Sequence, residues 1–209
     1  MRGAALLACL LLANACGTAP DPSSHSFETA SPTPGPTCLN IGAEVDSAPE
    51  TMANLAAFSS AVVVGRFDGE DPAQWNTRSG ERPRGSSNLG VLIFRPIRIT
   101  LTTVLRGAPG AVLGARVEGG DIGCDSNHLS NELRLGAGAR YVFFLQPEWD
   151  PANARSLNPW VLAAWPLEPD GSVLSPLEGD LPIATLRHVL ATTPVRPLPT
   201  AGPLPSPSR

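Results

Sequence analysis

The sequence predicts a mainly β protein: a small antiparallel barrel of five to six strands, with a short helix before it and another helix at its end. Residues 97–102 alternate apolar and polar side chains, which is typical of a strand with one buried and one wetted face. Residues 61–67 form a short valine-rich run of the kind that fills the interior of a sheet. No strand–helix–strand unit is visible, so the pattern favours a barrel over a layered α/β fold.

The first helix is predicted from a start signal. Ser47 can cap it, Pro49 suits the first turn and Glu50 closes a capping box. The apolar residues that follow at helical spacing extend it through Leu55 and Phe58.

The strands are predicted from short apolar runs between turns. Residues 68–88, after the first strand, are polar and contain Gly, Pro and Arg, which predicts a long surface loop. Further strands are expected at 97–105, 111–118, 141–145, 160–167 and 172–174. The final helix, over 182–191, is expected to follow an Asp180 cap, and its apolar side chains are Ile183, Leu186, Val189 and Leu190.

The first sixteen residues, MRGAALLACLLLANAC, are typical of a secretory signal peptide, with one positive charge at Arg2 and an apolar run too short to span a bilayer. The end of this segment, Ala-Asn-Ala-Cys-Gly, approximates the lipobox of bacterial lipoproteins, although Ala13 replaces the usual leucine. We therefore expect residues 1–15 to be removed and Cys16 to carry acyl chains such as palmitate. These chains would attach the protein to the extracytoplasmic face of the cell membrane. Ordinary cleavage and plain secretion are the alternative.

The four cysteines fit the lipoprotein interpretation. Cys9 leaves with the signal and Cys16 is lipidated, so only Cys38 and Cys124 remain, and an oxidising compartment would pair them. Plain secretion would instead leave Cys16 as a free thiol and three cysteines in the exported protein.

Composition sets the domain boundaries. Residues 16–37 and 194–209 are rich in Pro with Ser and Thr, which predicts a disordered tether and a disordered tail around one domain over residues 38–193. The formal net charge is −4 and the arginines are scattered, so the composition argues against nucleic acid as a partner.

The order of elements resembles the netrin/tissue-inhibitor-of-metalloprotease module, a five-stranded OB-fold barrel. The resemblance is carried by Cys38, by a helix leading into 58–65, by Val-Leu-Arg-Gly at 104–107, by Gly-Cys at 123–124, and by LGAGARYVFFL at 135–145. It implies an OB-like barrel over roughly residues 38–175 and a bond between Cys38 and Cys124.

The function of that family is not carried over. Its inhibitors are understood to chelate a protease's zinc with the free α-amine and carbonyl of an N-terminal cysteine. Cys38 is preceded by the tether, so its nitrogen is an amide and a poor ligand. The other cysteines of the animal inhibitors are also missing.

One cluster has the residue types of a metal site: Asp121, Cys124, Asp125 and His128. A zinc or copper site would need Cys124 as a thiolate, whereas in the alternative Cys124 is in a disulfide, the two aspartates form turns and His128 is solvated. The sequence has no nucleophile elbow, zinc-protease motif or phosphate-binding loop, so we expect a non-enzyme without a cofactor.

Trp75 falls in the predicted loop at 68–88, where it either anchors a partner or folds back on the barrel. We expect a membrane-tethered binding or interaction module that uses the barrel face or this loop to bind an envelope protein or polymer. The alternative is a metal-handling lipoprotein that uses the cluster at residues 121–128.

Overall fold

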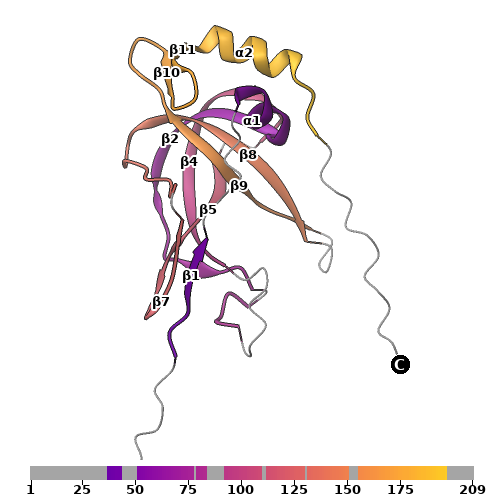
Figure 1. Cartoon of the computed structure of the whole chain (residues 1–209). Helices are drawn as coiled ribbons and strands as arrows, with labels where there is room; N and C mark the ends of the chain where they lie inside the picture. Colours follow the sequence, from indigo (N-terminus) through magenta and orange to yellow (C-terminus); the bar gives the residue numbers. More distant parts are fainter. Residues whose placement is uncertain are drawn as a thin grey trace, which may run out of the picture. The chain divides into compact units, whose positions relative to one another are not determined.

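Five long strands close into a barrel in the computed structural model (Figure 1). They are β2 (Ala61–Glu70), β4 (Ile93–Arg106), β5 (Val112–Glu118), β8 (Arg140–Asp150) and β9 (Arg155–Pro166). Around the ring the order is β2–β4–β5–β9–β8 and back to β2. The described residues are 37–43, 51–77, 79–83, 92–109, 112–129, 131–150 and 155–196. The predicted mainly β, OB-like barrel with two helices is thereby confirmed.

One pairing in the ring is parallel. Arg116 of β5 faces Trp160 of β9, and this contact closes the barrel. The other ring pairings are antiparallel. A short extra strand, β3 (Gln74–Trp75), adds to the start of β4.

The remaining elements lie outside the ring. They are β1 (Asn40–Ala43), α1 (Met52–Phe58), β6 (Gly120–Ile122), β7 (Asp125–Leu129), β10 (Ser172–Ser175), β11 (Gly179–Pro182) and α2 (Ile183–Thr192). β1, β7 and β6 form a separate three-stranded sheet in that order, with β1 parallel to β7. None of the described helices is long and apolar enough to cross a membrane.

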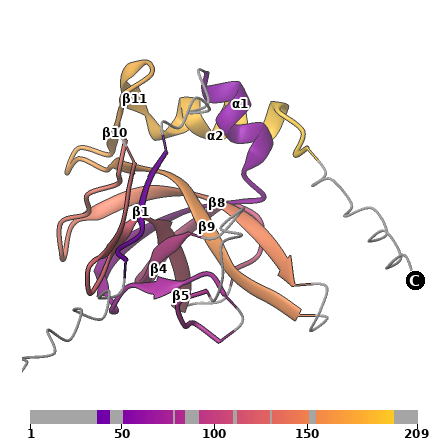
Figure 2. The same ribbon diagram turned by 60° about the horizontal axis from the view of Figure 1, so that its bottom comes forward.

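The apolar residues form two clusters on opposite sides of the barrel wall. Val63, Ile99 and Phe143 belong to the cluster inside the barrel. Val62 and Phe144 belong to the other cluster, in which α1, α2 and the β10–β11 hairpin cover the outer face of β2, β8 and β9 (Figure 2). β2 and β8 are thus buried on both faces, which explains why their sequences are continuous apolar runs rather than alternating ones.

The two helices start later than the sequence suggests. α1 begins at Met52, where the Thr51 hydroxyl accepts a hydrogen bond from the Asn54 amide at 3.2 Å. The predicted start signal at residues 47–50 lies outside the described residues. The predicted Asp180 cap is wrong, because Asp180 lies in β11, which runs directly into α2 without a side-chain cap.

The prediction of a structureless loop at residues 68–88 is also wrong in part. β2 continues through Glu70, and β3 pairs with β4 inside the predicted loop. Two pairings are parallel, namely β5–β9 in the otherwise antiparallel barrel and β1–β7 outside it.

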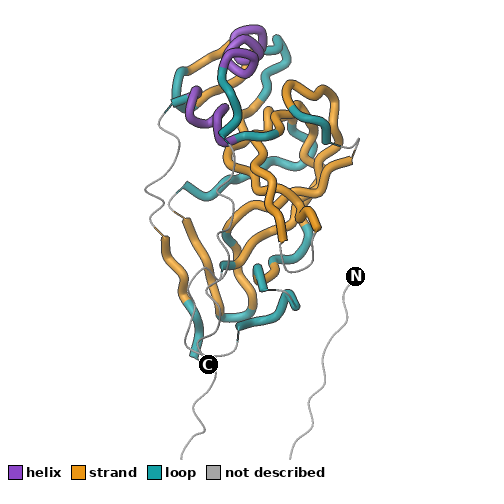
Figure 3. The backbone as a smooth tube through the Cα atoms, turned by 90° about the vertical axis from the view of Figure 1, so that its right-hand side faces the viewer, coloured by secondary structure: helices purple, strands orange, loops and turns teal. Residues whose placement is uncertain are grey.

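A single guanidinium joins both helices to the barrel. Arg106, at the end of β4, donates from Nη1 to the Ala56 carbonyl of α1 and from Nη2 to the Leu190 and Thr193 carbonyls at the end of α2. The last carbonyls of a helix have no partner within the helix, so an arginine there satisfies them and complements the helix dipole. Figure 3 shows the two helices together at one end of the strands.

Replacing Arg106 with methionine tests this junction, because methionine keeps an unbranched apolar stem and removes every donor. We expect the free energy of unfolding, measured by urea titration of the full chain with its disulfide intact, to fall by about 2–3 kcal/mol. The control is Arg98→Gln, on the same strand, whose half-exposed side chain pairs with Asp71. It should cost less than about 1 kcal/mol, and equal losses in the two variants would contradict the role given to Arg106.

Candidate functional site

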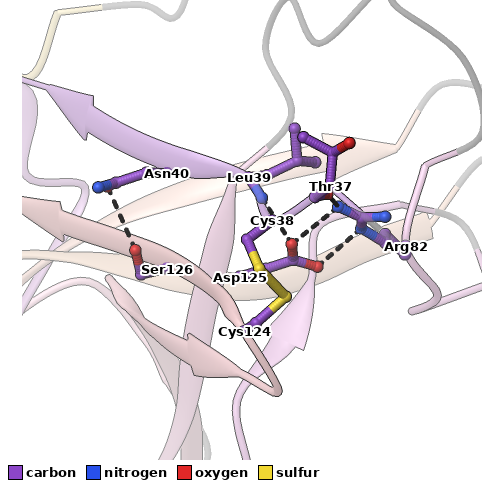
Figure 4. The surroundings of a disulfide bond; sticks show 8 residues. All are labelled: Thr37, Cys38, Leu39, Asn40, Arg82, Cys124, Asp125 and Ser126. Carbon is purple, nitrogen blue, oxygen red and sulfur yellow. Dashed lines mark hydrogen bonds and ion pairs between the residues drawn. A yellow bond between two sulfur atoms is a disulfide. The ribbon is translucent and has the colours of Figure 1, made fainter. Parts of the chain in front are cut away.

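The predicted disulfide is present and marks the point where the chain enters the domain (Figure 4). Cys38 and Cys124 are bonded, with their Cα atoms 5.4 Å apart and a sequence separation of 86 residues. In the chain-entropy model a link across a loop of this length stabilises the fold by about 4–5 kcal/mol. Cys16 and the rest of the predicted tether up to residue 36 lie outside the described residues.

Asp125, next to the disulfide, fixes the first residues of the domain. Its Oδ1 accepts a hydrogen bond from the Leu39 amide at 2.7 Å. The Leu39 carbonyl in turn accepts one from the Ser126 amide at 2.9 Å, which starts the parallel pairing of β1 with β7. The Asp125 side chain therefore extends the contact between β1 and β7 by one hydrogen bond beyond the Ser126–Leu39 backbone bond.

Arg82 completes this arrangement from the connection between β3 and β4. Its Nε lies 2.7 Å from Oδ2 of Asp125, and its Nη2 donates to Oδ1 of Asp125 at 2.8 Å and to the Thr37 carbonyl. Figure 4 shows the guanidinium between the carboxylate and the incoming chain. The Leu39 amide, and after it Arg82, hold the pKa of Asp125 below its usual value. We call Cys38, Cys124, Asp125, Leu39 and Arg82 the tether clamp.

The structure separates the residues of the predicted metal site. β6 and β7 are antiparallel, with Asp121 opposite Ser126, so Asp121 and His128 share the solvent face, and His128 Nε2 lies 3.1 Å from Asp121 Oδ1. Asp125 lies on the opposite face because side chains alternate along a strand. Its carboxylate is bound to Arg82, and Cys124 is in the disulfide. Among the described residues, no group of three or more His, Cys, Asp or Glu side chains could hold a metal ion.

Trp75 cannot act as an exposed anchor in this structure. It lies in β3 opposite Ile93 and is 2% exposed. Of the two interpretations of this residue, the structure agrees with the second, in which the side chain folds back on the barrel. The reason is that β3 pairs with β4 at a place where the surrounding sequence gives no strand pattern.

Sequence reasoning missed a cluster on the outer wall of the barrel, where β5 meets β9. The Arg116 guanidinium lies 4.2 Å from the centre of the Trp160 ring and 5.3 Å from that of Phe94. Its Nε donates to the Asn158 carbonyl at 2.8 Å. The two rings meet edge to face at 5.8 Å. These residues come from three strands, and only barrel closure brings them together, so no local sequence signal could have revealed them.

Comparisons of this chain with family models, with curated proteins and with solved structures gave no match. Any function must therefore be argued from the chain's own residues.

The lowered pKa of Asp125 predicts how the stability of the Asp125→Asn variant should depend on pH. A carboxylate whose pKa is lower in the folded state contributes stability above its unfolded pKa, about 3.9, and loses it as the pH falls through the folded pKa. We expect the variant to be less stable than the natural chain at neutral pH, and the difference to disappear below the folded pKa. Urea unfolding between about pH 7 and pH 2, with the disulfide intact, measures it.

The matched control is Asp180→Asn, which changes an exposed carboxylate of β11. Its difference from the natural chain should stay small across the same pH range. A deficit in Asp125→Asn that is constant with pH would mean that the carboxylate charge does not stabilise the tether clamp.

Proposed function

We propose that this chain is a lipid-anchored, extracytoplasmic, non-enzymatic binding module whose barrel is joined to its anchor by the Pro-, Ser- and Thr-rich segment. The observation that carries the proposal is the tether clamp. A disulfide, a buried carboxylate and an arginine all converge on residues 37–39, where the Pro-, Ser- and Thr-rich segment meets the domain. Such a disulfide persists in an oxidising compartment, which supports export of the chain.

The anchor in this proposal is Cys16. With Cys38 and Cys124 bonded to each other, Cys16 would be the one unpaired cysteine of an exported chain cut after Ala15. Lipidation removes that thiol and supplies acyl chains, and two or more chains are enough for stable attachment to a membrane.

The binding surface in this proposal is the outer face of β4 and β5. The barrel interior is filled by side chains, and the helices and the β10–β11 hairpin cover the outer face of β2, β8 and β9. Arg116 and Phe94 are only 7% and 9% exposed and form a packed support under the β4–β5 face, so a partner would meet the exposed side chains beside them, such as Arg98, Thr100 and Asn158. OB-type barrels bind ligands on the face of their second and third strands. The partner would be an envelope protein or an envelope polymer.

Kinship with the netrin/tissue-inhibitor-of-metalloprotease module is part of the same proposal. The Cys38–Cys124 bond, at the positions that the resemblance implies, and the OB-like strand order support it. Zinc chelation through the amine of Cys38 is not part of it, because that nitrogen is an amide.

The anchor is tested by labelling cells that express the full chain with radioactive palmitate. We expect label in the natural chain and none in Cys16→Ser, because the acceptor sulfur is gone. Cys9→Ser is the matched control and should keep the label, because Cys9 leaves with the signal. Globomycin, which blocks the lipoprotein signal peptidase, should cause the precursor to accumulate. An unlabelled natural chain, or a labelled Cys16→Ser variant, would rule out the anchor.

The binding face is tested with Asn158→Arg. Asn158 is exposed, its side chain lies against Gly114 of β5, and its carbonyl holds Arg116, so a longer charged side chain there should block an approaching partner. We expect capture of envelope components by the full chain to fall about tenfold or more, as for a residue central to an interface. The control is Thr185→Arg, which adds the same charge on the exposed side of α2. Equal capture by both variants would exclude the β4–β5 face.

A further inference from the structure

The sheet formed by β1, β7 and β6, which we call the tether sheet, is attached to the barrel in an unusual way. None of its described side chains belongs to either apolar cluster. Its buried side chains are polar, namely Asp125 at 5% exposure and Asn127 at 0%. In Figure 1 the β1 and β7 strands lie toward the bottom of the molecule and the helices at the top. The tether sheet therefore lacks the apolar packing that secures the helices.

Polar contacts of side chains join the tether sheet to β4. Asn127 Nδ2 donates to the Ile93 carbonyl at 3.2 Å. Glu132, which follows β7, places its Oε1 2.9 Å from Arg95 Nη2, and the same Nη2 donates to the Leu133 carbonyl at 3.1 Å. Arg95 and Glu132 are only 18% and 20% exposed, so this ion pair is screened less than one on the open surface.

Two buried polar atoms of the described residues have no hydrogen-bond partner, and both belong to this junction. They are Nε of Arg95 and Oδ1 of Asn127. A buried polar atom left without a partner costs free energy that is recovered when water reaches it.

The connection between β5 and the tether sheet is a pair of glycines. Gly119 and Gly120 have φ angles of +107° and +131°, a region that side chains disfavour. A Cβ atom on Gly120 would also lie 3.2 Å from the Arg95 Cγ atom and from the Ala73 Cβ atom. Glycine at both positions allows the close approach, and it permits rotation of the backbone once the 2.9 Å hydrogen bond from the Gly119 amide to the Ile93 carbonyl is broken.

We propose that the tether sheet undocks from the barrel as one body about Gly119–Gly120, with the Arg95–Glu132 and Arg82–Asp125 ion pairs holding it closed and the disulfide keeping β1 on β7 throughout. This goes beyond the proposed function and holds whether or not Cys16 is lipidated. Tension on the chain before Cys38 would act on the tether sheet, which that chain enters, and on Arg82, which donates to the Thr37 carbonyl.

The experiment is amide hydrogen exchange, followed by NMR on the full chain with its disulfide intact. We expect the amides of β6 and β7 to share one opening reaction, with one common dependence on denaturant, and to exchange at least about tenfold faster than the amides of β2 and β8. Exchange of both groups only through global unfolding would overturn the proposal. Unrelated rates from one β7 amide to the next would also overturn it, because they indicate fraying.

Two variants make the test specific. Glu132→Gln removes the charge that pairs Arg95 with the segment after β7 and leaves the pair of Arg95 with Glu70 of β2, so the β6 and β7 amides should exchange about tenfold faster. The β2 and β8 amides should speed up as well, since global unfolding also breaks the pair. Ile99→Val weakens the barrel core far from the tether sheet, so only the β2 and β8 amides should accelerate, by about threefold or more. If Ile99→Val accelerates the β6 and β7 amides equally, no separate opening exists.

Discussion

The parallel pairing of Arg116 with Trp160 is the contact on which the architecture depends, because it turns an open sheet into a closed barrel. Closure removes the two edges that an open sheet would expose and forces the inward side chains of every ring strand into one interior. Phe143, Ile99 and Val63 fill that interior. Side chains packed in this way fill the centre of the five-stranded barrel.

The sequence predicts those parts of the fold in which burial leaves a local trace. β2 and β8 are recognisable because both of their faces are buried, and β4 because one face is buried and the other is wet. The β1, β6 and β7 strands leave no such trace. The sequence of β7, DSNHL, has no apolar alternation, and its pairing with β1 is set by Asp125 and by a bond that joins residues 86 positions apart.

The candidate sites were harder to predict than the fold, for a geometric reason. Asp121, Asp125 and His128 are close in sequence and would share a centre if the segment were a turn. In a pair of strands the two faces alternate, and Asp125 points away from the other two. The burial of Trp75 was not predictable for a related reason, since two residues of strand pairing are enough to bury its ring. The Phe94, Arg116 and Trp160 cluster has no local signal, because three separate strands supply it.

The order in which the parts of this molecule separate under load follows from the kinds of contact that join them. Within the tether sheet, the chain that enters β1 is joined to β7 by a covalent bond and by Oδ1 of Asp125, which accepts from the Leu39 amide. Between the tether sheet and the barrel there are hydrogen bonds and two ion pairs, Arg95–Glu132 and Arg82–Asp125, with two buried polar atoms unsatisfied. Between the helices and the barrel there is an apolar cluster, reinforced by Arg106. A force applied at Cys38 is transmitted through the Cys38–Cys124 disulfide to β7 and then to the polar junction between the tether sheet and the barrel. It therefore strains that junction before it disturbs either apolar cluster.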